Sequence, residues 1–246
     1  MKINLPGFNA LLAQEQERFR RSATEIVCES FIFTADRDYL TARFAFFQKQ
    51  SHLFLWSTAQ AIEKYLKANI LLLGKGSITK RHHHAEMATD LMESHPERLQ
   101  IELSIPEGWE DQGVTLWPSI DVLGFLKRIE KLGSPNVRYD QVSLEIHLQD
   151  LVFLDRLAFR LRDRLVAESV QSCRLVGEAL TDCFLDLNDA FAPADYRHPP
   201  LAGLRQFHAS VTTLEAALKG CYGHQALYKA WAKNSMDYSP KGSAQS

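Results

Sequence analysis

The chain has 246 residues, of which 46% are hydrophobic and 24% are charged, and its formal net charge is -2. This composition supplies enough apolar residues for a sizeable core and excludes an intrinsically disordered chain. The near-neutral charge also excludes a global basic field that would attract nucleic acid without a local basic site.

Apolar residues at helical spacing dominate the first half of the chain. Helices are expected over 8–28, from a cap at Asp36 or Asp38 to about Gln48, over 51–73 and over 84–94. Gly74 follows the third of these helices and is a residue able to end it in a left-handed conformation. The region after the fourth helix is rich in proline, glycine and charge, and it is expected to be irregular.

The second half of the chain continues the helical pattern. Further helices are expected over 118–132, 149–170, 171–190, 201–219 and 223–234. Alternating apolar residues over 142–148 leave a short strand open. The predicted class is therefore all-α. Four parts are expected: an N-terminal extension (1–35), a helical bundle (36–170), a C-terminal helical extension (171–236) and a disordered tail (237–246).

The sequence predicts a cytoplasmic protein with no membrane contact. Its start has no apolar signal-like region, and the longest apolar run, 68–73, is far too short to span a bilayer. The cysteines form no C-x-x-C pair, so we expect free, partly buried thiols. They are Cys28, Cys173, Cys183 and Cys221.

The third predicted helix carries two contrasting faces. Its apolar face is formed by Leu55, Ala59, Ile62, Leu66 and Leu73. Its narrow polar stripe is formed by Gln60, Glu63, Lys64 and Lys67. An exposed Glu63–Lys67 pair at this spacing would contribute about 0.3–0.5 kcal/mol. The stripe is open to three interpretations: a solvent face, a dimer rim, or one wall of a binding site.

Familiar catalytic and metal motifs are not recognisable in the sequence. Three consecutive histidines, His82 to His84, would point about 100° apart on one helix, so they predict a polar helix start and no metal site. The glycines of "LLLGKGSITK" follow a helix, which is the wrong setting for a phosphate-binding loop. No G-x-S-x-G sequence is present, and no cysteine lies in a recognisable protease context.

Three segments together resemble a known family. They are "DRDYLTARF", "AQAIEKYLKANILLLGKG" and "NVRYD". The second is similar to the signature helix of HEPN domains (higher eukaryotes and prokaryotes nucleotide-binding domains). Asp38, Tyr39, Ala42 and Arg43 resemble the start of the first HEPN helix, and Arg138-Tyr139 resembles the start of the last. The resemblance covers about residues 36–165. The sequence departs from the family pattern at the His-Asp-Leu step and at Asp140.

The resemblance implies an up-and-down bundle of four or five helices that forms a homodimer and needs no cofactor. Family members act as ribonucleases, as toxins paired with nucleotidyltransferases, or as noncatalytic modules that bind nucleotide or RNA. Catalytic members carry an arginine, then four to six intervening residues, and then a histidine on the same helix. No arginine here has a histidine five to seven positions later. Arg138 and His147 are the candidate pair, but they are nine residues apart, which turns a helix by about 900° and places them on opposite faces.

Three functions follow as hypotheses. The first is a noncatalytic HEPN-like module that binds nucleotide, RNA or a protein partner. Its candidate binding residues are Arg43, Gln60, Glu63, Lys64, Lys67, Arg138 and Tyr139, with Tyr39 or Tyr65 as further stacking candidates. The second is a toxin-like, metal-independent endoribonuclease that uses Arg138 and His147. The third is a purely structural protein that only dimerises or contacts a partner.

Overall fold

The computed structural model describes residues 8–74, 82–101, 103, 120–134, 141–143, 146–168 and 212–213. Its longer helices are α1 (Ala13–Val27), α2 (Phe33–Phe47), α3 (Ser51–Leu72), α4 (His84–Ser94), α5 (Val122–Leu132) and α7 (Leu148–Glu168). Its shorter elements are η1 (Phe8–Ala10), η2 (Cys28–Ile32), η3 (Pro96–Arg98), β1 (Gln141–Ser143) and β2 (Thr212–Thr213). Apart from the two short strands, every regular element described is a helix, so the all-α class is confirmed for this part of the chain.

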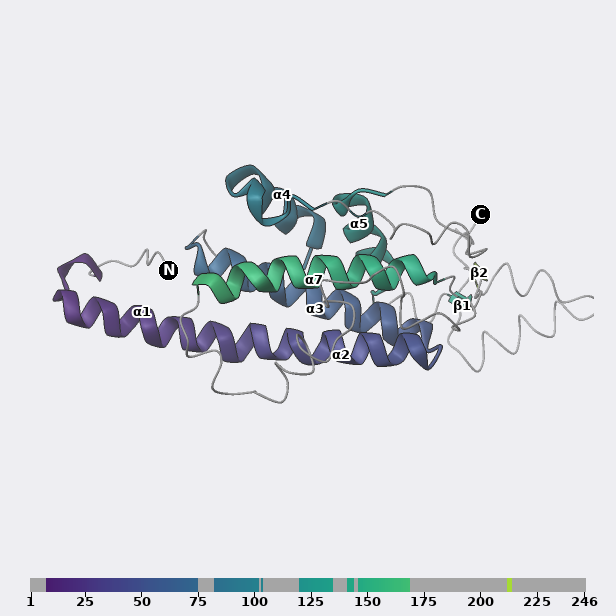
Figure 1. Ribbon diagram of the computed structural model, residues 1–246, viewed down its shortest axis with the longest axis horizontal. Helices are drawn as coiled ribbons and strands as arrows, with labels where there is room; N and C mark the ends of the chain where they lie inside the picture. The colour runs from purple at the N-terminus through teal and green to yellow at the C-terminus, as the bar shows by residue number, and fades with distance from the viewer. Residues whose placement is uncertain are drawn as a thin grey trace, which may run out of the picture.

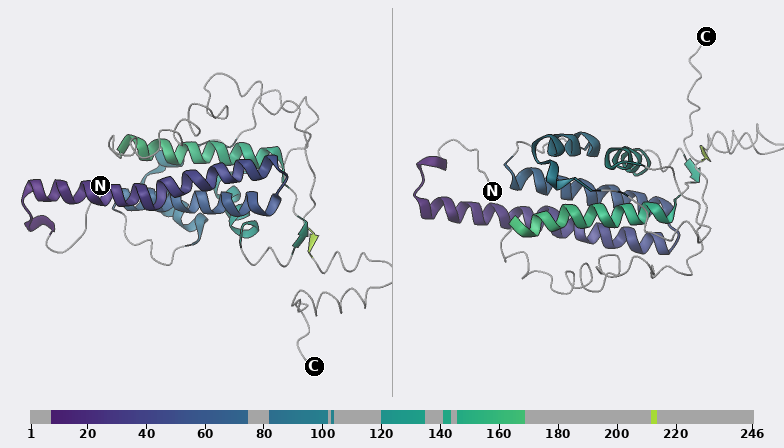
Figure 2. Two further views of the ribbon diagram at one scale, coloured as in Figure 1. Left: turned by 90° about the horizontal axis from the view of Figure 1, so that it is seen from below. Right: turned by 45° about the horizontal axis from the view of Figure 1, so that its top comes forward.

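Helix α3 lies at the centre of a bundle. Helices α2 and α7 pack along one side of it, and α4 and α5 cover another side (Figures 1 and 2). A tight turn joins α2 to α3, and Lys49 in this turn has a left-handed φ of 59°. The two helices therefore run antiparallel, and Phe46 of α2 contacts Phe54 of α3 with ring centroids 5.3 Å apart. The apolar interior of the bundle surrounds α3.

Helices α1 and α2 form one long helical segment. The π-helical turn η2 joins them without a break, so α1 extends past the end of the bundle (Figures 1 and 2). The prediction that Asp36 or Asp38 caps a separate second helix is wrong. Asp36 lies inside α2 and is buried, because its carboxylate is bound by side chains of α3 and α7. The expected division between residues 35 and 36 therefore falls within a continuous helix.

Other helix boundaries follow the sequence pattern closely. The predicted helices over 51–73 and 84–94 are confirmed as α3 and α4. Gly74 follows α3 with a φ of 66°, as expected of a glycine that ends a helix. Helix α5 begins after Asp121, whose side chain accepts a hydrogen bond from the Gly124 amide at 2.6 Å.

The C-terminal predictions fall mostly outside the described residues. This holds for the expected helices over 171–190 and 223–234 and for the tail (237–246). The predicted helix over 201–219 is wrong at Thr212–Thr213, which form β2 and pair antiparallel with β1. The strand left open over 142–148 is present only in part, because β1 covers Gln141–Ser143 and Leu148 already begins α7.

The structure also bears on the predictions about membrane contact and about free cysteine thiols. None of the helices described is long and apolar enough to cross a bilayer. Cys28, which is buried in the π-helical turn, is disulfide-bonded, so the prediction of a free thiol is wrong for this residue. Cys173, Cys183 and Cys221 lie outside the described residues.

Candidate functional site

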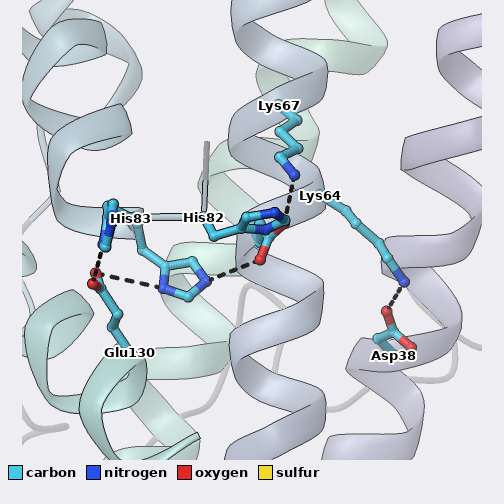
Figure 3. A network of polar contacts seen from close by, with 8 residues as sticks. Asp38, Lys64, Lys67, His82, His83 and Glu130 are labelled. Carbon is cyan, nitrogen blue, oxygen red and sulfur yellow. Dashed lines mark hydrogen bonds and ion pairs between the residues drawn. The ribbon is translucent and has the colours of Figure 1, made fainter. Parts of the chain in front are cut away.

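The polar stripe of α3, defined as Gln60, Glu63, Lys64 and Lys67, is neither in the core nor fully in solvent. All four side chains are half-buried, whereas Ala59, Ile62 and Leu66 on the predicted apolar face are buried. The predicted amphipathic character of the helix is confirmed. The stripe lies between two flanking elements, because Lys64 reaches α2 while Glu63 and Lys67 face the start of α4 (Figure 3).

Both lysines of the stripe are paired with carboxylates. Lys64 donates to Asp38 of α2, and Lys67 Nζ lies 2.5 Å from Glu63 Oε1. The predicted pair between Glu63 and Lys67 is therefore confirmed, although it is more buried than a surface pair. An anionic ligand at this stripe would have to compete with Asp38 and Glu63 for the two ammonium groups.

Three consecutive histidines converge on two carboxylates beside the stripe (Figure 3). His82 Nδ1 lies 3.1 Å from Glu63 Oε1, and His83 Nδ1 lies 2.9 Å from Glu130 Oε1 of α5. His84 lies between the two, with Nε2 3.7 Å from Glu63 Oε2 and Nδ1 3.8 Å from Glu130 Oε2. The predicted polar helix start is confirmed at His84, but the expected divergence does not apply to His82 and His83, because they precede α4 and do not follow helical geometry. We call the whole set the His/Glu cluster: Glu63, Lys67, His82, His83, His84 and Glu130.

The two carboxylates of the His/Glu cluster have pKa values below their ordinary value. Burial alone would raise the pKa of Glu63, but the hydrogen bond and charge of Lys67, with His82 and His84, hold it below its ordinary value. Burial would likewise raise the pKa of Glu130, yet His83 and its other neighbours hold it low. Both carboxylates are therefore ionised at neutral pH.

The histidines of this cluster differ in environment. The exposed ring of His83 has its pKa raised by the hydrogen bond and charge of Glu130. His84 is only 4% exposed, and burial lowers its pKa even though Glu63 and Glu130 act in the opposite direction. Neither ring nitrogen of His84 makes a hydrogen bond of normal geometry. The pKa values of these neighbouring histidines therefore shift in opposite directions, because Glu130 dominates at exposed His83 and burial dominates at His84.

Arg43, a predicted binding residue, takes part in a buried contact elsewhere in the bundle. Its guanidinium donates to Asp155 of α7, which also accepts a 2.5 Å hydrogen bond from the Tyr39 hydroxyl. Burial would lower the pKa of Arg43, but Asp155 and Tyr39 raise it further than burial lowers it. The structure therefore ties Arg43 and Tyr39 to α7, while Lys64 and Lys67 pair with Asp38 and Glu63.

A second buried carboxylate joins the same three helices. Asp36 of α2 accepts two hydrogen bonds from Arg162 of α7, at 2.8 and 2.9 Å, and one from Tyr65 of α3 at 2.5 Å. Burial and the charge of Asp36 raise the pKa of Tyr65 well above its ordinary value, so its hydroxyl stays protonated as a donor. Tyr65 and Tyr39 are both fully buried and cannot stack on a base in this conformation.

Of the candidate catalytic pair Arg138 and His147, the structure describes only His147. Arg138 and Tyr139 lie outside the described residues. His147 lies just before α7, is 2% exposed, and donates its backbone N–H to Asp150 at 2.9 Å. Asp150 in turn holds Arg128 of α5, with 3.1 Å between Nε and Oδ1. The imidazole of His147 is therefore part of the packed interior.

Sequence reasoning missed Glu130 and Asp155. Neither has a neighbouring motif, and their partners lie 47 and more than 100 residues away in the chain. Among the residues described, no group of three or more His, Cys, Asp or Glu side chains is arranged to hold a metal ion. No protein-family model matches the chain, and searches of curated proteins and of solved structures also returned no match.

Proposed function

We propose that this chain is a noncatalytic HEPN-like helical module that acts by associating with a second copy of itself through α1. The observation that carries the proposal is a row of exposed apolar side chains on this protruding helix and directly before its first residue. Leu12, Phe19 and Ile26 are 72%, 41% and 63% exposed. Phe19 and Ile26 are seven residues apart, so they lie on one face of α1 about 20° from each other, and Leu12 directly precedes the helix at the same spacing.

This row continues the spacing of residues that already pack in the bundle. Phe33, Leu40 and Phe47 extend the same seven-residue interval along α2, and all three are half-buried against the core. An apolar row with heptad spacing is typical of a helix that packs against another helix. A second α1 offers a matching row, and an isologous pair is the commonest form of self-association.

The alternative functions receive less support from the same contacts. Cleavage by Arg138 and His147 needs an imidazole that can reach RNA, whereas His147 is buried. Phosphate binding by Arg43, Lys64 and Lys67 would require breaking their ion pairs with Asp155, Asp38 and Glu63. Association through α1 requires no existing pair to be broken.

The test is the molar mass in solution, measured by light scattering after size exclusion. We expect a dimer for the native chain and a monomer for a Phe19→Ser/Ile26→Ser variant of unchanged helical content. Phe44→Ser is the matched control, since Phe44 is also apolar and is 61% exposed, but on α2. A monomeric native chain, or a dimer lost only in Phe44→Ser, would contradict the proposal.

Catalysis is tested separately, with mixed RNA in the presence of EDTA. We expect no cleavage by the native chain at any protein concentration at which the mass measurement is made. Metal-independent cleavage that disappears in His147→Ala would support the endoribonuclease instead.

A further inference from the structure

The first turn of α4 is held in place by a histidine that is poorly satisfied where it lies. His84 is buried at the junction of α3, α4 and α5, and its two ring nitrogens face carboxylates on two different helices. The distances of 3.7 and 3.8 Å are too long for hydrogen bonds.

A neutral imidazole cannot match both neighbours. It has one N–H and one lone pair, so when one ring nitrogen faces a carboxylate as a donor, the other presents its lone pair to the second carboxylate. His84 is thus packed as an apolar ring, and its polar atoms gain little from Glu63 and Glu130.

We propose that His84 is a pH-operated latch: in its neutral form it keeps the first turn of α4 packed against α3 and α5, and on protonation it leaves this site and releases that turn. The latch lies apart from α1 and does not depend on the association proposed above.

The reason for release is the cost of a buried imidazolium. The two carboxylates are already engaged, because Glu63 Oε1 contacts Lys67 and His82, and Glu130 Oε1 contacts His83. Their remaining attraction for His84 is partly cancelled by the ammonium of Lys67. A charge moved into a packed interior without full hydrogen bonding is unfavourable, whereas outside the junction the imidazolium regains its hydration.

Every charged group that faces the latch contributes with a definite sign. Burial and Lys67 disfavour the imidazolium of His84, whereas Glu63, Glu130 and a backbone contact with Ala59 favour it, with burial outweighing the rest. Glu86 of α4 acts mainly on His83, whose pKa it raises together with Glu130. Acid therefore strengthens the exposed contact of His83 while it weakens the buried packing of His84, and an experiment must separate the two residues.

The direction with pH follows from linkage. The pKa of His84 is lower in the packed state than its ordinary value of 6.5, so the released state binds the proton more tightly. Below pH 6.5, and down to the pKa of the packed state, the equilibrium constant for release should rise up to about tenfold for each pH unit. Above pH 6.5 it should stay constant.

The experiment is hydrogen exchange between pH 5 and 8, corrected for intrinsic rates, with the Met87 amide as reporter. This amide donates to the His83 carbonyl at 3.1 Å and is therefore protected only while the first turn is formed. We expect its protection in the native chain to fall up to about tenfold per pH unit below 6.5. His84→Leu should abolish that pH dependence, and the matched control His83→Gln should retain it.

A second measurement keeps the test independent of how well His84→Leu folds. The imidazole of His84 in the native chain is titrated by NMR, and its pKa is expected below 6.5. A pKa at or above 6.5 would overturn the latch. So would Met87 protection that is independent of pH, or that keeps its pH dependence in His84→Leu.

Discussion

Two polar clusters flank α3, and they differ in how completely their charges are satisfied. Toward α2 and α7, Asp36 receives three hydrogen bonds, and Asp155 receives donors from both Tyr39 and Arg43. Toward α4 and α5, the His/Glu cluster leaves both ring nitrogens of His84 without a hydrogen bond. Buried carboxylates with a full set of donors, such as Asp36 and Asp155, favour one packing arrangement of the helices. A shift of one helix along another would leave a buried charge unpaired.

The difference identifies which interface of α3 is fixed and which can change. The α2–α3–α7 interface has two buried carboxylates that are bound by side chains of its three helices. The α3–α4–α5 interface holds a buried histidine, His84, whose pKa is lowered by burial and whose ring nitrogens make no hydrogen bond with a neighbouring side chain. We therefore expect large losses of stability from substitutions in the first cluster and smaller, pH-dependent effects in the second.

The largest effect is expected for Arg162→Met. Removing the guanidinium leaves Asp36 buried with only the Tyr65 hydroxyl as a donor, which should lower the free energy of unfolding by about 3–5 kcal/mol. Urea denaturation followed by circular dichroism measures the loss. The double variant Asp36→Leu/Arg162→Met should recover part of it, and an equal or greater loss in the double variant would show that Asp36 is not the source.

A smaller loss is expected for Tyr39→Phe. The variant removes one donor from Asp155 but leaves the contact with Arg43, so we expect about 1–2 kcal/mol by the same denaturation experiment. Thr41→Val is the control on the same helix, since the Thr41 hydroxyl is on the exposed face and bonds only to the Arg37 carbonyl. Its effect should stay within about 0.5 kcal/mol. Equal losses in the two variants would mean that the buried hydroxyl has no special role.

The His/Glu cluster should respond in pKa more than in stability. In Glu130→Gln the pKa of His83 should fall toward 6.5, because Glu130 is the main cause of its rise. A raised pKa stabilises the fold below 6.5, and this contribution is lost as pH rises through the pKa of the folded state. NMR titration of the imidazoles measures the change, with Glu93→Gln on α4 as control. An unchanged His83 would contradict the contact with Glu130.

The smallest effect is expected at the polar stripe. Lys64→Met breaks a half-exposed pair with Asp38, and such pairs contribute about 0–1 kcal/mol. Thermal unfolding at low and high salt measures it, and the difference between variant and native chain should shrink in high salt. A loss comparable to that of Arg162→Met would remove the contrast between the two sides of α3.

Sequence alone was sufficient for the elements with dense periodic patterns. Helix α3 could be predicted with its polar stripe and its Gly74 stop because its signals are local, within a few residues of one another. Asp36 was misread for a related reason. An acidic residue near the start of an apolar pattern is typical of a helix cap, and nothing nearby reveals a partner 126 residues away in Arg162.

The His/Glu cluster could not be predicted either, because its contacts are not local in the sequence. Adjacent histidines diverge on a helix, but only His84 belongs to α4, whose start agrees with the predicted one, so the 100° spacing does not apply to His82 and His83. The convergence also needs Glu63 and Glu130, which α3 and α5 bring together from distant parts of the chain. Tertiary packing therefore brings this cluster together, and no local motif could predict it.

The most direct test of the proposed association is hydrogen exchange of α1 at several protein concentrations. If a second copy covers Leu12, Phe19 and Ile26, protection of the α1 amides should rise with concentration, while protection of the α3 amides at the centre of the bundle stays constant. Protection of α1 that does not change across the concentration range, or that changes in parallel with α3, would contradict the account.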